Sequence, residues 1–142
     1  PLASRFQHVL ATELSKPATE AARCNAEVNK VANVEFARLS AAEMTSAIVG
    51  ERPYRRLSHL RQPLDQYNLC TLLVDPPRAG LDDATINLAA GLDRILYISC
   101  NPRTLAGDLR TLTTTHAISE LAFFDQFPYT HHLESGVILT RR

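Results

Sequence analysis

The hydrophobic residues of this chain fall into short apolar runs that alternate with segments of helical periodicity. The segment CTLLVDPP is a continuous apolar run, which is typical of a strand covered on both faces. Between residues 16 and 32, small and apolar residues recur near one face of a helix. The pattern predicts strands at residues 8–14, 34–40, 70–77, 94–99, 120–127 and 136–142, and helices at about 16–32, 41–49, 82–92 and 102–112.

This order of elements predicts an α/β protein. Strands that alternate with helices form right-handed crossovers and a mostly parallel sheet. The last two strands follow each other without a helix, so we expect an antiparallel pair at the C-terminal end. In such sheets, ligands bind outside the carboxyl ends of the strands. We therefore expect Glu13, Asp75 and Cys100, which follow three of the strands, at one rim, with Glu134 in the connection between the last two strands.

The composition narrows the class of protein. The 142 residues suit a single domain with a sizeable core. The 15 basic and 15 acidic residues cancel, so any contact with nucleic acid must come from a local patch. No apolar run approaches the roughly 20 residues that span a bilayer, and the three cysteines form no CxxC pair. The simplest interpretation is a cytoplasmic protein with no membrane association and no disulfide framework.

Cys100 lies in the segment LYISCNP, where an apolar run ends and an Asn-Pro step begins. Asn101 and Pro102 suit the N-cap and the first position of a helix. The cysteine would then lie at a strand-to-helix junction near the positive end of a helix dipole, a setting that favours the nucleophilic thiolate. The alternative is a buried cysteine that acts as a small hydrophobic residue.

The segment VDPPRAGL carries Asp75 directly after a buried strand, and its two prolines fix the backbone there. A related Asp/Asn-Pro-Pro-aromatic motif belongs to methyltransferases that modify amino nitrogens, in which the aromatic ring stacks on the target. Arg78 takes the aromatic position here, which argues against amino-group methylation. The alternative is a strand end followed by a turn at Ala79 and Gly80.

Three further features are ambiguous from the residues alone. Glu13 at the end of the first strand could accept hydrogen bonds from the ribose hydroxyls of a nucleotide-type cofactor, but strand-end acids are often only solvated. The segment 52–61 interleaves four arginines and a histidine with a tyrosine, which suits either RNA contact or a solvated loop. His131 and His132 lack the spacing of a metal site, and a cysteine hydrolase that pairs one of them with Cys100 lacks an evident oxyanion hole.

Taken together, the segments DPPRAGL, ISCNP and FDQFPYTHHLESG, in this order and spacing, resemble the RNA (uracil-5-)-methyltransferases. The resemblance runs from HVLATELSKP to the end of the sequence. The PYTHHLE segment is most similar to the bacterial branch of the family, which makes 5-methyluridine in the T-loop of tRNA. The resemblance implies a Rossmann-like fold that uses S-adenosylmethionine as the methyl donor and tRNA as the substrate, with no metal and no inferred protein partner.

The family motifs imply roles by position. Cys100, in the Ser-Cys-Asn-Pro motif, would be the nucleophile that adds to C6 of the uracil. Glu134, at the acid of the His-His-x-Glu motif, would be the base that removes the C5 proton. Glu13 and Asp75 match acids that contact S-adenosylmethionine. Two other interpretations stay open: a non-catalytic RNA-binding module, and an enzyme that methylates a uridine of ribosomal RNA.

The family's first strand and its glycine-containing cofactor loop have no counterpart among the five glycines of this sequence. We therefore expect residues 1–142 to be the C-terminal part of the catalytic domain, without its first strand. That strand would lie between the strands at 8–14 and 70–77, and its loss leaves unpaired backbone groups on both. We expect these two strands either to pair directly or to accept a strand from a second molecule. We also expect the isolated chain to be inactive and to bind S-adenosylmethionine weakly or not at all.

Overall fold

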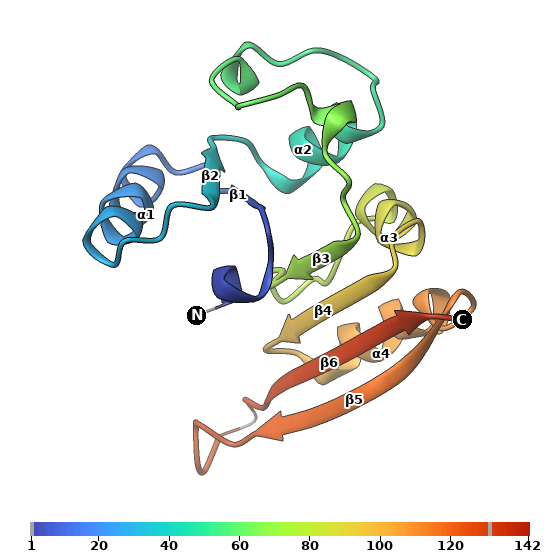
Figure 1. Cartoon of the computed structure of the whole chain (residues 1–142). Helices are drawn as coiled ribbons and strands as arrows, with labels where there is room; N and C mark the ends of the chain where they lie inside the picture. Colours follow the sequence, from blue (N-terminus) through green and yellow to red (C-terminus); the bar gives the residue numbers. More distant parts are fainter. Residues whose placement is uncertain (1, 131) are drawn as a thin grey trace. The chain divides into compact units, whose positions relative to one another are not determined.

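The chain forms two compact units, each built around its own sheet (Figure 1). The computed structural model describes residues 2–130 and 132–142. The first unit ends at Tyr67 and contains a two-stranded sheet, and the second begins at Asn68 and contains a four-stranded sheet. None of the helices in the described ranges is both long and apolar enough to cross a bilayer.

The first unit begins with a β-α-β crossover. Strands β1 (Val9–Thr12) and β2 (Val34–Ala37) pair in parallel, and helix α1 (Lys16–Val28) connects them. The helix begins where the side chain of Ser15 accepts a hydrogen bond from a backbone N–H of the first turn. The periodicity predicts a helix to about residue 32, but the helix ends earlier because the chain turns at Lys30 with a left-handed φ of 55°.

Helix α2 (Ala41–Ile48) starts with a capping box. The Ser40 hydroxyl accepts a hydrogen bond from the N–H of Glu43, and the Glu43 carboxylate accepts one from the N–H of Ser40. The core of this unit is small, because only Ala37 and two other hydrophobic residues, Leu39 and Met44, are buried in it. Three short 3₁₀ helices complete the unit: Leu2–Arg5, Arg55–Leu57 and Leu64–Gln66.

The second unit is a four-stranded sheet with the strand order β3-β4-β6-β5. Strands β3 (Thr71–Val74) and β4 (Arg94–Ser99) are parallel. Strand β6 (Glu134–Arg141) runs antiparallel to both of its neighbours, β4 and β5 (His116–Phe124), which confirms the antiparallel pair expected at the C-terminal end. Two helices complete the unit: α3 (Asp83–Ala90) and α4 (Pro102–Leu112).

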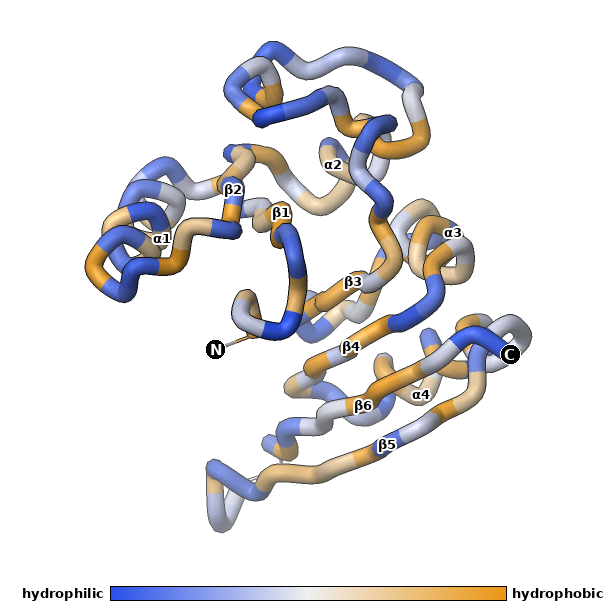
Figure 2. Tube along the Cα trace, in the orientation of Figure 1, coloured by the Kyte–Doolittle hydropathy of each residue, from blue (hydrophilic) through white to orange (hydrophobic). Residues whose placement is uncertain are grey.

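One face of this sheet carries the core of the second unit. Alternate residues of β4 and β6 point to the same side, so Ile95, Tyr97 and Val137 are buried. Burial stabilises the fold by roughly 1.5–3 kcal/mol for each large apolar side chain. On the other face, Leu73 and Ile98 stay partly exposed, although hydrophobic residues run through β3 and β4 (Figure 2). The helices complete the core with Ile86, Ala89, Leu105 and Leu112.

The last two strands differ from their predicted bounds. Strand β5 overlaps the predicted segment 120–127, but it starts at an earlier residue, His116, and ends at an earlier residue, Phe124. A register shift between Ile118 and Glu120 interrupts its pairing with β6, so the alternation of apolar and polar residues that marks a strand is lost there. Strand β6 begins at Glu134, so this residue lies in a strand, and its predicted place in the connection is wrong.

Strands β1 and β3 belong to different sheets, so a direct pairing of the two strands is not formed. Within residues 2–130 and 132–142, β1 pairs with β2 and β3 pairs with β4. Each of them is therefore an edge strand of its own sheet and presents backbone N–H and C=O groups that no other described strand pairs with.

Candidate active site

Cys100 lies in the turn between β4 and α4, as the sequence predicts. The buried Ser99 hydroxyl accepts a hydrogen bond from the N–H of Asn101 and donates one to the Asn101 carbonyl oxygen, both at 3.1 Å. The Asn101 side chain caps the helix by accepting from the N–H of Arg103 at 3.2 Å, and Pro102 opens the first turn. The half-buried, free thiol of Cys100 is thus held between two residues whose positions are fixed by hydrogen bonds.

The loop after β3 is tied to the start of the same helix. The backbone carbonyl oxygen of Arg78 accepts a hydrogen bond from the side-chain amide of Asn101 at 3.0 Å and from the Thr104 hydroxyl at 3.1 Å. Asp75 is the first residue after β3, and its carboxylate is exposed. The DPPR and SCNP segments, which are separated by more than twenty residues in the sequence, are therefore joined directly by hydrogen bonds.

A second link between this loop and α4 comes from Asp108, which the sequence analysis missed. Its Oδ2 atom accepts hydrogen bonds from the Tyr97 hydroxyl at 2.6 Å and from the N–H of Leu81 at 3.0 Å. A Cβ atom at Gly80, where φ is 85°, would lie 2.8 Å from the same oxygen. The sequence did carry a signal for this role, because Asp108 lies on the apolar face of an amphipathic helix, among Leu105, Leu109 and Leu112.

Tyr97 is fully buried in β4, and its hydroxyl depends on Asp108. Burial, followed by the hydrogen bond and the negative charge of Asp108, raises the pKa of Tyr97 well above its ordinary value. The hydroxyl therefore stays protonated and donates to the carboxylate throughout the physiological pH range. This bond connects the strand that leads to Cys100 with Asp108 on α4, and the bond from the N–H of Leu81 connects Asp108 with the loop that follows β3.

Glu134 begins β6 next to the end of β4. The antiparallel register pairs Ser135 with Ser99, and its extension by one residue places Glu134 beside Cys100. Glu134 is half-buried, and within the described part of the chain its carboxylate has no hydrogen-bond or ion-pair partner. Cys100, Glu134 and Asp75 thus lie at the same end of the sheet of the second unit.

Glu13 belongs to the first unit, where it directly follows β1. One carboxylate oxygen accepts a hydrogen bond from the N–H of Ser15 at 2.6 Å, and its backbone carbonyl oxygen accepts one from the Thr19 hydroxyl at 3.1 Å. The side chain is exposed. Glu13 therefore organises the start of α1 and leaves its second carboxylate oxygen toward solvent.

The arginine-rich segment 52–61 holds the edge of β2. The Arg56 guanidinium donates to the carbonyl oxygen of Arg38 at 2.7 Å, and that of Arg61 donates to the carbonyl oxygen of Ala32 at 3.0 Å. The His59 ring is 2.8 Å from the carbonyl oxygen of Phe36. These side chains satisfy backbone carbonyl groups in and beside β2, a structural role that the sequence analysis did not consider.

His132 contacts the Arg78 guanidinium and the edge of the Phe127 ring, whose centroid is 6.0 Å away. No hydrogen bond joins His132 to Cys100 in the described ranges, and His131, the other histidine of the hydrolase interpretation, lies outside the described residues. Among the residues that the structure describes, no three His, Cys, Asp or Glu side chains are arranged to hold a metal ion.

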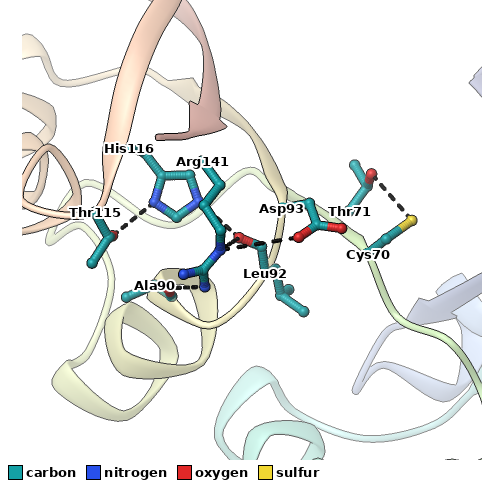
Figure 3. A network of polar contacts seen from close by, with 8 residues as sticks. All are labelled: Cys70, Thr71, Ala90, Leu92, Asp93, Thr115, His116 and Arg141. Carbon is teal, nitrogen blue, oxygen red and sulfur yellow. Dashed lines mark hydrogen bonds and ion pairs between the residues drawn. The ribbon is translucent and has the colours of Figure 1, made fainter.

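A second polar network lies at the opposite end of β4 and β6 (Figure 3). The buried His116 ring is 2.8 Å from the Thr115 hydroxyl and 2.9 Å from the carbonyl oxygen of Leu92. The Arg141 guanidinium donates to the carbonyl oxygen of Ala90 at 2.7 Å. This network ties the end of β6 to the end of α3, so it stabilises the sheet at the end away from Cys100.

The sequence matches one described family along its whole length. The family model for tRNA (uracil-5-)-methyltransferase matches residues 1–142. The tRNA/tmRNA (uracil-C(5))-methyltransferase of Acinetobacter baumannii (strain AYE) is 53% identical over 141 residues, which are 99% of this chain and 39% of that protein. The same-named protein of Cellvibrio japonicus (strain Ueda107) is 54% identical over 142 residues, which are 100% of this chain and 38% of that protein. The chain thus spans about two fifths of the length of these curated relatives.

Solved structures with the same fold are methyltransferases. The Pyrococcus abyssi tRNA (uracil-54, C5)-methyltransferase, in complex with S-adenosyl-L-homocysteine, superposes with a TM-score of 0.67 at 30% identity and covers 98% of this chain and 30% of its own. A precorrin-6y C5,15-methyltransferase from Geobacter metallireducens gives a TM-score of 0.62 at 14% identity, with coverage of 94% and 67%, and shows likeness of fold alone. The predicted Rossmann-like methyltransferase fold is confirmed.

Proposed function

Because this chain belongs to the tRNA (uracil-5-)-methyltransferase family, we propose that the whole protein methylates C5 of a uridine in tRNA through a covalent adduct with Cys100. We propose further that residues 1–142 form the C-terminal part of its catalytic domain. The observation that supports this chemistry best is the pairing of β4 with β6, because its last pair, Ser99 with Ser135, is next in the chain to both Cys100 and Glu134.

The chemistry needs a nucleophile that can both add and leave. C5 of uracil is a poor nucleophile, so the Cys100 thiolate first forms a bond to C6, and the electron pair of the C5–C6 double bond moves into an enolate. C5 would then use that pair to bond to the methyl group of a bound methyl donor, whose sulfur would keep the electron pair of the broken sulfur–methyl bond. A base removes the proton from C5, the double bond forms again, and the bond between sulfur and C6 breaks to return the thiolate. Glu134 is the proposed base.

The residues present fit S-adenosylmethionine, which when bound would supply the electrophilic methyl group. The Asp75 carboxylate directly follows a parallel strand, is exposed, and has no partner within the described ranges. Glu13 follows another parallel strand and has one carboxylate oxygen that no described residue contacts. Acids at such positions accept hydrogen bonds from the hydroxyls and the ammonium group of nucleotide-type cofactors. We propose that these two acids hold the methyl donor.

Cys100 can be tested directly as the nucleophile. In the full-length protein, an RNA that carries 5-fluorouridine at the target position should form an adduct that survives denaturing gel electrophoresis, because fluorine at C5 cannot leave as a proton. Cys100→Ala should form no adduct. Cys24→Ala and Cys70→Ala, which remove exposed free thiols elsewhere, are the matched controls and should form it normally. An undiminished adduct in Cys100→Ala would contradict the assignment.

The same experiment separates the alternatives. A non-catalytic RNA-binding module would bind the tRNA transcript but form no adduct and incorporate no methyl group from labelled S-adenosylmethionine. An enzyme for ribosomal RNA would form the adduct with a ribosomal RNA fragment in preference to the tRNA transcript.

A further inference from the structure

The described part of the connection between β5 and β6, residues 125–130 with 132 and 133, forms a tip at the end of the sheet that carries the candidate active site. The tip starts from the paired residues Phe124 and Glu134. Glu134, the proposed proton acceptor, therefore lies where the connection rejoins the sheet. From there the chain continues past the ends of both strands to a turn (Figure 1). A molecule that reaches Cys100 and Glu134 over this rim would therefore meet the tip.

The tip contains an ordered turn. The N–H of Thr130 donates to the carbonyl oxygen of Phe127 at 3.2 Å, and the Thr130 hydroxyl donates to the same oxygen at 2.7 Å. Pro128 is the second residue of this turn, and Tyr129, the third, has φ of 64°. This is the arrangement of a type II turn, whose third position favours glycine or asparagine. The backbone at this position does not favour tyrosine, so we explain the presence of Tyr129 by a role of its ring and not by the turn.

The rings at the tip are exposed to solvent. Tyr129 is fully exposed, at 107%, and Phe127 is 46% exposed. Beside them, the Arg78 guanidinium contacts the His132 ring, which in turn contacts the edge of Phe127. The tip thus combines flat aromatic surfaces with a cationic group, the combination that contacts stacked bases and phosphates in single-stranded nucleic acid.

The charges elsewhere in the chain offer few other surfaces for RNA contact. Positive and negative residues balance, so RNA contact needs a local patch. The arginine-rich segment 52–61 is the most basic part of the sequence, but Arg56, His59 and Arg61 are bound to backbone carbonyl groups around β2. By contrast, no residue in the described ranges hydrogen-bonds to the Tyr129 side chain or stacks on its ring.

We infer that this tip is an RNA contact, in which the Tyr129 ring stacks on an unpaired nucleotide next to the target uridine and Arg78 faces a phosphate group. The inference rests on the proposed function, because it takes the substrate to be a folded RNA whose target base leaves its stack. Phe127, supported by His132, extends the aromatic surface at the base of the turn.

The test uses the full-length protein and an unmodified tRNA transcript. Tyr129→Gly removes the ring and suits the left-handed backbone, so it separates a role of the ring from a role of the turn. We expect it to weaken RNA binding on the order of tenfold or more, whereas Tyr129→Phe, which keeps the ring, stays close to the wild type. Gln126→Ala, an exposed neighbour in the same connection, is the matched control and should bind normally.

A 2-aminopurine placed beside the target uridine reports stacking directly. Its fluorescence should be quenched by the wild type and by Tyr129→Phe, and the quenching should be lost with Tyr129→Gly. Unchanged RNA affinity and quenching in Tyr129→Gly would overturn the inference, and so would a change confined to self-association, which would make the tip a protein contact. Failure of the proposed function is distinct, because the wild type would then form no adduct with 5-fluorouridine RNA.

Discussion

At the residue scale, the relation between Cys100 and Glu134 is set by the register of two antiparallel strands. Cys100 directly follows the last residue of β4, and Glu134 is the first residue of β6. The last pair of the ladder, Ser99 with Ser135, directly precedes Cys100 and directly follows Glu134 in the chain. Paired positions on neighbouring antiparallel strands have Cα atoms about 4.5–5.5 Å apart, so one further pair would give Cys100 and Glu134 a spacing that suits groups acting on neighbouring carbon atoms of one ring.

This arrangement leads to a prediction for Glu134. Glu134→Gln removes the basic carboxylate while nearly keeping its shape, so attack by Cys100 and methyl transfer should proceed but removal of the C5 proton should stall. Ordinary tRNA should then accumulate as a methylated covalent adduct, visible on a denaturing gel. Asp125→Asn, which neutralises an exposed acid of the same connection, should turn over normally. Normal turnover in Glu134→Gln would show that another group is the base.

At the element scale, one carboxylate joins a strand, a loop and a helix. Asp108 on α4 accepts from Tyr97 of β4 and from the N–H of Leu81 in the loop after β3. The loop that carries Asp75 and the turn that carries Cys100 are thus attached to the same helix. Any movement of α4 would therefore displace both ends of the proposed site together.

This network predicts a loss of stability when the acceptor is removed. Asp108→Ala leaves the buried Tyr97 hydroxyl and the Leu81 N–H without their acceptor, which should lower the free energy of unfolding by about 1–3 kcal/mol in urea titrations of the 142-residue chain. Asp108→Asn keeps a carbonyl oxygen that can accept both bonds and should cost less. Adding Tyr97→Phe to Asp108→Ala should recover part of the loss, because the orphaned hydroxyl is then absent. Equal stability of Asp108→Ala and the wild type would show that these bonds add nothing.

The elements that could be predicted from the sequence are those with strong local signals. Ser40 with Glu43 predicts the start of α2, and Asn101 with Pro102 predicts the start of α4 and so the setting of Cys100. The bounds of β5 could not be predicted, because a register shift interrupts the alternation that defines a strand. The start of β6 could not be predicted because Glu134 and Gly136 are residue types that strands disfavour. The roles of Asp108 and of the arginines around β2 depend on contacts between distant segments, which local periodicity does not encode.

At the scale of the whole molecule, the two acids proposed to hold the methyl donor follow edge strands of two different sheets. Glu13 follows β1 and Asp75 follows β3, and no ladder joins these strands in the part of the chain that the structure describes. Each of these strands therefore has one open edge, and neither sheet alone carries both acids. The expectation that a strand lies between them in the whole protein is consistent with these two open edges.

We therefore predict that the isolated 142-residue chain binds S-adenosylmethionine weakly or not at all. Isothermal titration calorimetry of this chain should show no saturable heat at micromolar concentrations, whereas the full-length protein should bind. Asp75→Asn in the full-length protein should weaken binding without unfolding it, because the carboxylate is exposed and no described residue bonds to it. Stoichiometric, micromolar binding by the isolated chain would contradict the prediction.

The strand order of the second unit also determines when its sheet can form during translation. Strand β6 lies between β4 and β5 but is synthesised after both of them. From the moment Ser99 leaves the ribosome until residues 134–141 leave it, β5 has no partner and one edge of β4 stays open, for about 2–8 seconds at typical elongation rates. The nascent chain therefore cannot pack Ile95 and Tyr97 into a core with Val137 and Leu139 until this interval ends. Glu134 enters the sheet in the same step that closes it, so under the proposed function an incomplete chain would lack the base that releases the RNA from Cys100.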